Sequence, residues 1–150
     1  MTLLDSFTGE RSRRVCVETL ATQRLVSGNR ELAEELTDCA EVRAVSPGQA
    51  LISQGADDTE IYFILAGTFD VIVNGRRVAG RGPGDHVGEM AAVQPAQRRS
   101  ATVIALEGAI VARLSAEAFS SLGSRHPQLY RLIAQELARR VLQLESRSIE

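Results

Sequence analysis

The sequence contains few of the residues that mark a metal centre, a disulfide framework or a membrane segment. Only two cysteines and two histidines occur among its 150 residues. Cys16 and Cys39 form no Cys-x-x-Cys pair and no cluster with histidine, which favours two reduced, packed thiols. No apolar run approaches the roughly 20 residues that span a bilayer, and the N-terminus lacks the basic and apolar regions of a signal peptide. We therefore expect a cytoplasmic protein without a membrane segment.

An excess of charge of one sign is also absent. The chain has 17 basic and 19 acidic residues, so its formal net charge at pH 7 is -2. No global basic field is available to recruit nucleic acid or an acidic membrane, and we expect neither partner for these residues. The hydrophobic content of 44% and charged content of 24% are typical of a globular protein, and the length suits one domain with its own core.

Residues 1–40 are predicted to form helices that precede the rest of the domain. The segment 10–25 carries its apolar residues, Val15 among them, on one helical face. Asn29 can then cap a second helix that continues through Cys39.

Residues 115–150 are predicted to be helical again. Ser115 can cap a helix over 116–122, and Gly123 is expected to end it. A long helix follows, and its apolar stripe continues to Leu144 with no capping residue beyond. We therefore expect the sequence to be a truncated part of a longer protein, with a further domain after the helix.

Between the two helical regions, residues 41–114 change to short apolar runs separated by turns. Asn74-Gly75 between two such runs is a strong hairpin signal, because both residues accept the positive φ of a type I′ turn. The last two runs, 101–106 and 109–114, are expected to pair through Glu107-Gly108. Many short strands with glycine-rich corners predict an α+β domain built on an antiparallel β-barrel or jelly roll, with N-terminal helices and a long C-terminal helix.

The stretch 82–103 combines groups that suit a phosphate and a sugar. Gly88-Glu89 can open one short helical turn, whose N–H groups favour an anion. Arg99 would add a fork of donors that matches two phosphate oxygens. Because the Glu89 carboxylate would repel phosphate, we expect it to accept a hydrogen bond from a sugar hydroxyl while pairing with the arginine. An ordinary loop with solvated arginines is the alternative, and the presence of both halves at this spacing favours a binding site.

These residues resemble the phosphate-binding cassette of cyclic nucleotide-binding domains, in which Gly-Glu and a small apolar turn precede Arg-x-Ala-Thr/Ser-Val. The matching segments are Gly88-Glu89-Met90-Ala91 and Arg99-Ser100-Ala101-Thr102-Val103. The resemblance implies that Arg99 binds the exocyclic oxygens of a 3′,5′-cyclic phosphate and that Glu89 binds the ribose 2′-OH. Gly88 is implied to let the backbone approach the ligand, and Arg99 is expected to be poorly paired until phosphate binds. Further phosphate contacts are implied for the N–H groups of Met90, Ala91 and Ala101 and the hydroxyl of Ser100.

The same resemblance implies that the base lies against the barrel, where Val71, Val78 and Ala79 line its pocket. In cAMP-dependent bacterial activators, a Thr-Ser pair on the long helix reads adenine. Leu144 and Glu145 stand at the matching place here, so selectivity for cAMP is not implied. An aliphatic pocket holds any base by burial and discriminates poorly. The long helix is implied to cover the base and to pair with its twin, which predicts a homo-oligomer.

Segments 62–79 and 82–95 resemble the sensor domains of the TIR-domain effectors of cyclic-pyrimidine (Pycsar) antiphage defence. That resemblance implies cUMP as ligand, with cCMP second, and a C-terminal TIR domain that cleaves NAD⁺. These 150 residues contain no nucleophile with a base, so we expect them to bind rather than catalyse. One alternative is the cAMP sensor of a transcription regulator, and another is an interaction module with an empty cassette. A metal-binding cupin is disfavoured, because only His86 and His126 are available.

Overall fold

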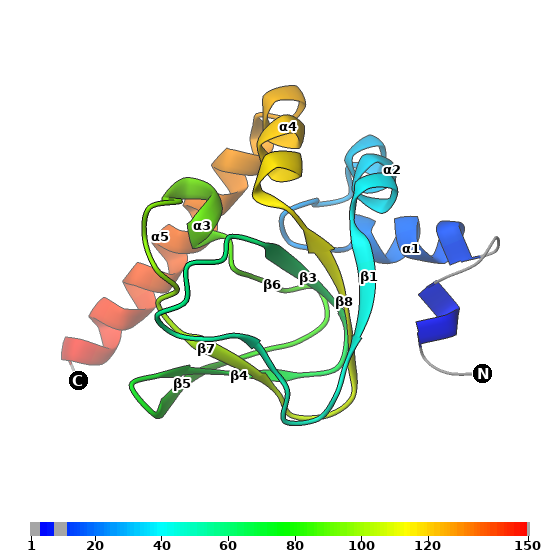
Figure 1. The fold of residues 1–150 in the computed structure, drawn as a ribbon. Helices are drawn as coiled ribbons and strands as arrows, with labels where there is room; N and C mark the ends of the chain where they lie inside the picture. Colours follow the sequence, from blue (N-terminus) through cyan, green and yellow to red (C-terminus); the bar gives the residue numbers. More distant parts are fainter. Residues whose placement is uncertain (1–3, 8–11, 150) are drawn as a thin grey trace.

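Two four-stranded antiparallel sheets form the centre of the structure, and helices lie along its outside (Figure 1). The computed structural model describes residues 4–7 and 12–149. The strands are β1 (Glu41–Val45), β2 (Ala50–Ile52), β3 (Ile61–Ala66), β4 (Phe69–Val73), β5 (Arg76–Arg81), β6 (His86–Val87), β7 (Thr102–Ala105) and β8 (Ala109–Leu114). One sheet has the order β1-β8-β3-β6 and the other the order β2-β7-β4-β5. The predicted fold class is confirmed.

Strands β3 and β8 are buried on both faces and separate two hydrophobic clusters. Neighbouring side chains on a strand point to opposite faces, so alternate residues of β3 enter different clusters. Ile61, Phe63 and Leu65 pack with the helices. Tyr62 and Ile64 pack between the two sheets. The unbroken apolar run of β3 therefore reflects burial on both sides.

The predicted hairpin at Asn74-Gly75 is confirmed. Both residues have positive φ, 52° for Asn74 and 77° for Gly75. Strand β4 pairs with β5 on either side of them. This backbone matches the right-handed twist of the two strands.

The predicted pairing of the last two strands is wrong. Strand β7 pairs with β2 and β4, whereas β8 pairs with β1 and β3. The connection through Glu107-Gly108 therefore crosses from one sheet to the other. Val103 of β7 and Val111 of β8 both enter the cluster between the sheets. Burying both apolar faces against each other requires the two strands to lie in opposite sheets, which a local hairpin could not achieve.

The N-terminal helices pack on the first sheet. Helix α1 spans Ser12–Ala21, α2 spans Arg30–Cys39, and a 3-10 turn covers Leu4–Phe7. Asn29 caps α2 as predicted, because its side chain accepts a hydrogen bond from the N–H of Leu32 at 3.1 Å. The helices bury their apolar faces in the cluster that also contains the outer face of β3.

The first helix differs in detail from the prediction. Of the predicted span 10–25, residues 10 and 11 lie outside the described part of the chain, and α1 ends at Ala21. Val15 is 41% exposed and does not belong to the buried stripe. The buried apolar residues of α1 are Cys16, Val17 and Leu20.

The C-terminal helices are α4 (Ala116–Arg125) and α5 (Gln128–Ile149). Ser115 caps α4 as predicted, because its hydroxyl accepts a backbone hydrogen bond at 3.1 Å. The expected break at Gly123 is wrong, since the helix continues through this residue. The ring of Tyr130 lies where a Cβ of Gly123 would be. The glycine therefore gives room for packing against α5 and does not end the helix.

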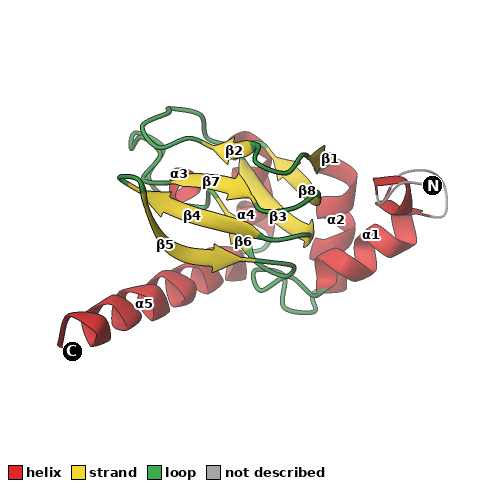
Figure 2. Cartoon of the chain, turned by 90° about the horizontal axis from the view of Figure 1, so that it is seen from below, coloured by secondary structure: helices red, strands yellow, loops and turns green. Residues whose placement is uncertain are grey.

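Helix α5 starts in the core and extends past the sheet edge formed by β5 (Figure 2). Leu129 and Ile133 are each 1% exposed, whereas Val141 is 51% and Leu144 is 61% exposed. Among the described residues, no helix is long and apolar enough to cross a membrane. The first half of α5 thus packs on the domain, and the pairing of its second half with another copy stays a prediction.

Candidate functional site

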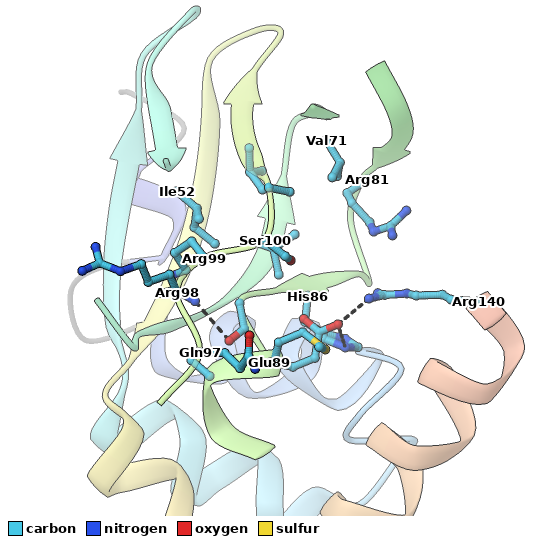
Figure 3. Close-up of a pocket in the computed structure, with 16 residues that line it drawn as sticks. Ile52, Val71, Arg81, His86, Glu89, Gln97, Arg98, Arg99, Ser100 and Arg140 are labelled. Carbon is cyan, nitrogen blue, oxygen red and sulfur yellow. Dashed lines mark hydrogen bonds and ion pairs between the residues drawn. The ribbon is translucent and has the colours of Figure 1, made fainter. Parts of the chain in front are cut away.

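One cavity brings the two halves of the predicted binding stretch together (Figure 3). It lies where β6, the short helix α3 (Met90–Val93) and the loop before β7 meet. Eight of the ten residues predicted to contact the ligand line it: Gly88, Glu89, Met90, Ala91, Arg99, Ser100, Ala101 and Val71. The cavity therefore combines a carboxylate, a guanidinium and a hydroxyl beside an apolar strand residue.

The other two predicted residues, Val78 and Ala79, line an adjoining cavity between β5 and α5. Arg81 and Arg140 line both cavities, so the two spaces are neighbours. Val71 and Ala79 are opposite each other in the β4–β5 pair. The predicted base pocket is thus divided between the two cavities.

Backbone hydrogen bonds fix the segment that carries Arg99. The N–H of Gly55 donates to the carbonyl of Arg99 at 2.8 Å, and the N–H of Arg99 donates to the carbonyl of Ala56 at 2.7 Å. The neighbouring Arg98 guanidinium donates to the carbonyl of Gly55 at 3.1 Å. These contacts attach the loop before β7 to the turn after β2 and direct the Arg99 side chain inward.

The Arg99 side chain is buried and already paired, which corrects the expectation that it is poorly paired before phosphate binds. Its Nη2 donates to Asp58 Oδ2 at 3.1 Å and to the carbonyl of Glu60 at 2.7 Å, and Nη1 donates to the carbonyl of Gly88 at 3.2 Å. Nε has no hydrogen-bond partner among the described residues. A buried guanidinium needs acceptors, and the fold supplies most of them itself.

Gly88 is a position where only glycine fits. Its φ is 91°, a left-handed backbone that L-residues with a side chain rarely adopt. An added Cβ would lie 2.6 Å from the carbonyl oxygen of Glu60 and 3.0 Å from Arg99 Nη1. The missing side chain therefore allows the close packing that places Arg99 against the turn into α3.

Glu89 pairs with Arg140 of α5 and not with Arg99, which corrects the predicted partner. The Arg140 guanidinium donates to Glu89 Oε1 in a short contact that links positions 51 residues apart. The Glu89 residue is 2% exposed. Burial makes an unpaired carboxylate costly, so Glu89 takes the nearest available cation, while Asp58 occupies Arg99.

His86 lies beside this ion pair and is almost completely buried. Neither ring nitrogen has a hydrogen-bond partner within the described part of the chain. Nε2 is 3.8 Å from Glu89 Oε1. Desolvation lowers the pKa of His86, with Arg140 acting in the same direction, whereas Glu89, Glu136 and Asp85 oppose it. The imidazole is therefore neutral at pH 7.

The free energy of unfolding is expected to fall as the pH decreases below about 6.5, in part because of His86. The unfolded chain then binds a proton that the folded chain, with its lowered histidine pKa, does not bind. Urea unfolding at pH 7.5 and 5.5 measures the loss, which should be smaller in His86→Leu. Glu35 and Glu136 also have lowered pKa values, but they act only below about pH 4.5. An unchanged pH dependence in the variant would contradict this assignment.

The cavity that contains Glu89 and Arg99 is called the cassette cavity below. Sequence patterns missed several residues that line it: Ile52, Arg81, His86, Val87, Gln97, Arg98, Val103 and Arg140. Arg140 had no available signal, because it lies on a helix far from the cassette in sequence. Arg81 follows the expected hairpin, but its side chain could not be assigned to a face, because the β4–β5 register shifts between Val71 and Ile72.

The described side chains offer binding groups rather than a metal centre. No group of three or more His, Cys, Asp or Glu residues within 4–7 and 12–149 is placed to hold a metal ion. Glu89 and Arg99 are both held by ion pairs. The arrangement suits recognition of an anion that carries hydroxyl groups.

Comparison with known proteins gives a family and relatives. Residues 42–126 match the family model described as Cyclic nucleotide-binding domain. The chain is 45% identical over 141 residues to the Pycsar effector protein BcPycTIR of Burkholderia cepacia. It is 43% identical over 141 residues to the Pycsar effector protein PaPycTIR of Pseudomonas aeruginosa. Each match covers 94% of this chain and 46% of the relative, so the chain spans about half the length of these curated relatives.

A solved structure shares the fold. The regulatory subunit of a cAMP-independent protein kinase A from Trypanosoma brucei superposes with a TM-score of 0.77. The match covers 93% of this chain and 52% of that chain, with 23% sequence identity. At this identity, the similarity concerns the fold alone.

Proposed function

Since this chain belongs to the cyclic nucleotide-binding domain family, we propose that it is the sensor domain of a bacterial antiphage-defence effector and that its ligand is cUMP. The observation that carries the proposal is the cavity that joins Gly88-Glu89 to Arg99-Ser100. The Pycsar effector relatives support the biological role. We further propose that the protein acts in the cytoplasm as a homo-oligomer paired through α5.

The cyclic phosphate is proposed to bind Arg99. Its Nε and the exposed Ser100 hydroxyl provide donors for the phosphate oxygens. The phosphate would compete with Asp58, whose contact with Nη2 is the one ion pair of Arg99 among the described residues. The N–H of Ala91 already donates to the carbonyl of Gly88 at 3.2 Å, so its implied phosphate contact requires a shared or rearranged hydrogen bond.

The ribose is proposed to bind Glu89 through the 2′-OH. This hydroxyl would share or replace the contact that Glu89 makes with Arg140 of α5. Ligand binding would then change the attachment of α5 to the cassette. A ligand shifts such an equilibrium only by its difference in affinity for the two states. In the full-length protein, this change is proposed to activate a TIR domain that cleaves NAD⁺.

Isothermal titration calorimetry of the chain against cUMP, cCMP, cAMP and cGMP tests the ligand. We expect cUMP to bind with the lowest Kd. A preference for cAMP would instead favour the alternative sensor of a transcription regulator, although Leu144 and Glu145 replace the adenine-reading pair. Absence of binding by all four nucleotides would contradict the proposed function.

A further inference from the structure

Arg81 occupies the junction of the two cavities. It ends β5, opposite the buried Phe69 of β4, and it lines the cavities on both sides together with Arg140. In Figure 3, Arg81 and Arg140 lie on one side of Glu89, and Arg98 and Gln97 lie on the other. When a ligand is held at Arg99 and Glu89, the part of it that extends toward α5 would therefore contact Arg81.

Arg81 differs from the neighbouring arginines in its partners. Each of the others that line these cavities near α5 has a carboxylate partner, in the pairs Arg24–Asp85, Arg139–Glu136 and Arg140–Glu89. For Arg81, no ion pair with a described carboxylate is formed, and Nη1 donates only to the carbonyl of the adjacent Gly80 at 2.9 Å. Most of its five N–H donors therefore remain available for a ligand.

The surroundings of Arg81 make these donors effective. The side chain is partly buried, and desolvation, with Arg140 acting in the same direction, lowers its pKa, whereas the charges of Asp85, Glu89 and Glu136 oppose the shift. An arginine nevertheless stays protonated, so two guanidinium groups border the same space. Arg140 is paired with Glu89, so an acceptor placed beside Arg81 would gain charge-assisted hydrogen bonds from a guanidinium that forms no ion pair with a described carboxylate.

We propose that Arg81 determines base specificity by donating hydrogen bonds to a carbonyl oxygen of the pyrimidine. This inference rests on the proposed function and adds the residue that selects the base. Val71, on the neighbouring strand, offers an apolar contact to the ring in the same cavity. The apolar contact with Val71 holds the ring of any base, whereas the Arg81 guanidinium distinguishes the polar groups on the edge of the base.

The chemistry of the bases explains the direction of the selectivity. Uracil carries a carbonyl oxygen at O2, which cytosine shares, and a second one at O4, opposite the sugar, which can accept from Arg81. Cytosine carries an amino group in place of O4, and adenine carries no carbonyl oxygen. A guanidinium only donates, and an amino group facing it leaves both partners unsatisfied. At position 4, Arg81 therefore favours uracil over cytosine, and it favours uracil over adenine, whose acceptors are ring nitrogens only.

The test replaces Arg81 by methionine, which keeps an unbranched side chain and removes the donors. Arg76→Met is the matched control, because Arg76 lies on the same strand, is exposed and lines neither cavity. Calorimetric Kd values are measured for cUMP, cCMP and cAMP with the wild type and both variants. For R81M we expect the Kd of cUMP to rise about 10- to 100-fold, the scale of a lost hydrogen bond to a charged group. The Kd of cAMP should change less than about threefold, and R76M should bind all three like the wild type.

Several outcomes would overturn the inference. Equal weakening of all three ligands in R81M would mean that Arg81 acts through its charge on the shared phosphate. Unchanged cUMP binding would mean that Arg81 does not contact the base. A wild-type chain that binds no cyclic nucleotide would overturn the proposed function and this inference together. A thermal unfolding midpoint of R81M close to that of R76M confirms that a loss of binding is not a loss of fold.

Discussion

Replacement of Arg99 by alanine is expected to weaken cyclic nucleotide binding by about 2–5 kcal/mol, or about 30- to 5,000-fold in Kd. The side chain is buried at the centre of the cassette cavity, and its position is fixed by backbone contacts to Gly55 and Ala56. The neighbouring Arg98 also lines the cavity but is exposed, so Arg99 is the buried cation of this loop. Calorimetry with cUMP measures the effect.

The same substitution tests the pairing found in the structure. Without Arg99, the carbonyl of Glu60 loses the donor of its 2.7 Å contact, the carbonyl of Gly88 keeps only the N–H of Ala91, and Asp58 loses its ion pair. Arg99→Ala should therefore also lower the free energy of unfolding, by about 1–3 kcal/mol for the unsatisfied groups. Arg76→Ala is the matched control, because it removes the same charge from an exposed arginine that lines neither cavity. Near-wild-type binding by Arg99→Ala in a folded chain would contradict the site.

Replacement of Gly88 by alanine is expected to cost about 2–5 kcal/mol of folding free energy and to abolish binding. Two effects combine, since φ is 91° and an added Cβ would lie 2.6 Å from the backbone oxygen of Glu60. That oxygen belongs to the main chain and cannot rotate away. Its movement would displace Arg99, which donates to it. Urea unfolding and calorimetry measure the two consequences.

Gly84→Ala separates the two effects. Gly84 has nearly the same φ, 93°, but a Cβ there would meet no atom within 4 Å. Its substitution should therefore cost only the backbone strain, about 1–3 kcal/mol, and should leave cUMP binding close to that of the wild type. Equal destabilisation by the two substitutions would show that the contact with Glu60 contributes nothing.

The ion pair between Glu89 and Arg140 connects the cassette to helix α5. Arg140 stands on α5, whose distal residues Val141 and Leu144 are exposed, and Glu89 is proposed to hold the ribose. A ligand that alters this pair changes how firmly the helix is held on the domain. The proposed pairing with a second copy uses the same helix, so this proposal links occupancy of the site to assembly through α5.

Features that depend on neighbouring residues could be predicted from the sequence alone. The Asn74-Gly75 hairpin follows from the positive φ that both residues accept, and the caps at Asn29 and Ser115 follow from side chains that bond to nearby N–H groups. The cassette motifs were also predicted, because a turn with a fixed backbone shape leaves a local pattern in the chain. The fold class was predicted because short strands alternate with turns along the sequence.

Features that depend on contacts between distant residues follow from the packing of the folded chain and leave no local pattern in the sequence. The crossing of β7 and β8 into opposite sheets follows from burial between the sheets, and the helical course through Gly123 follows from the ring of Tyr130. The partners of the charged residues in the site were decided in the same way. Asp58 takes Arg99, and Arg140 takes Glu89, because a buried charge pairs with whichever opposite charge the fold brings within reach, regardless of separation along the chain.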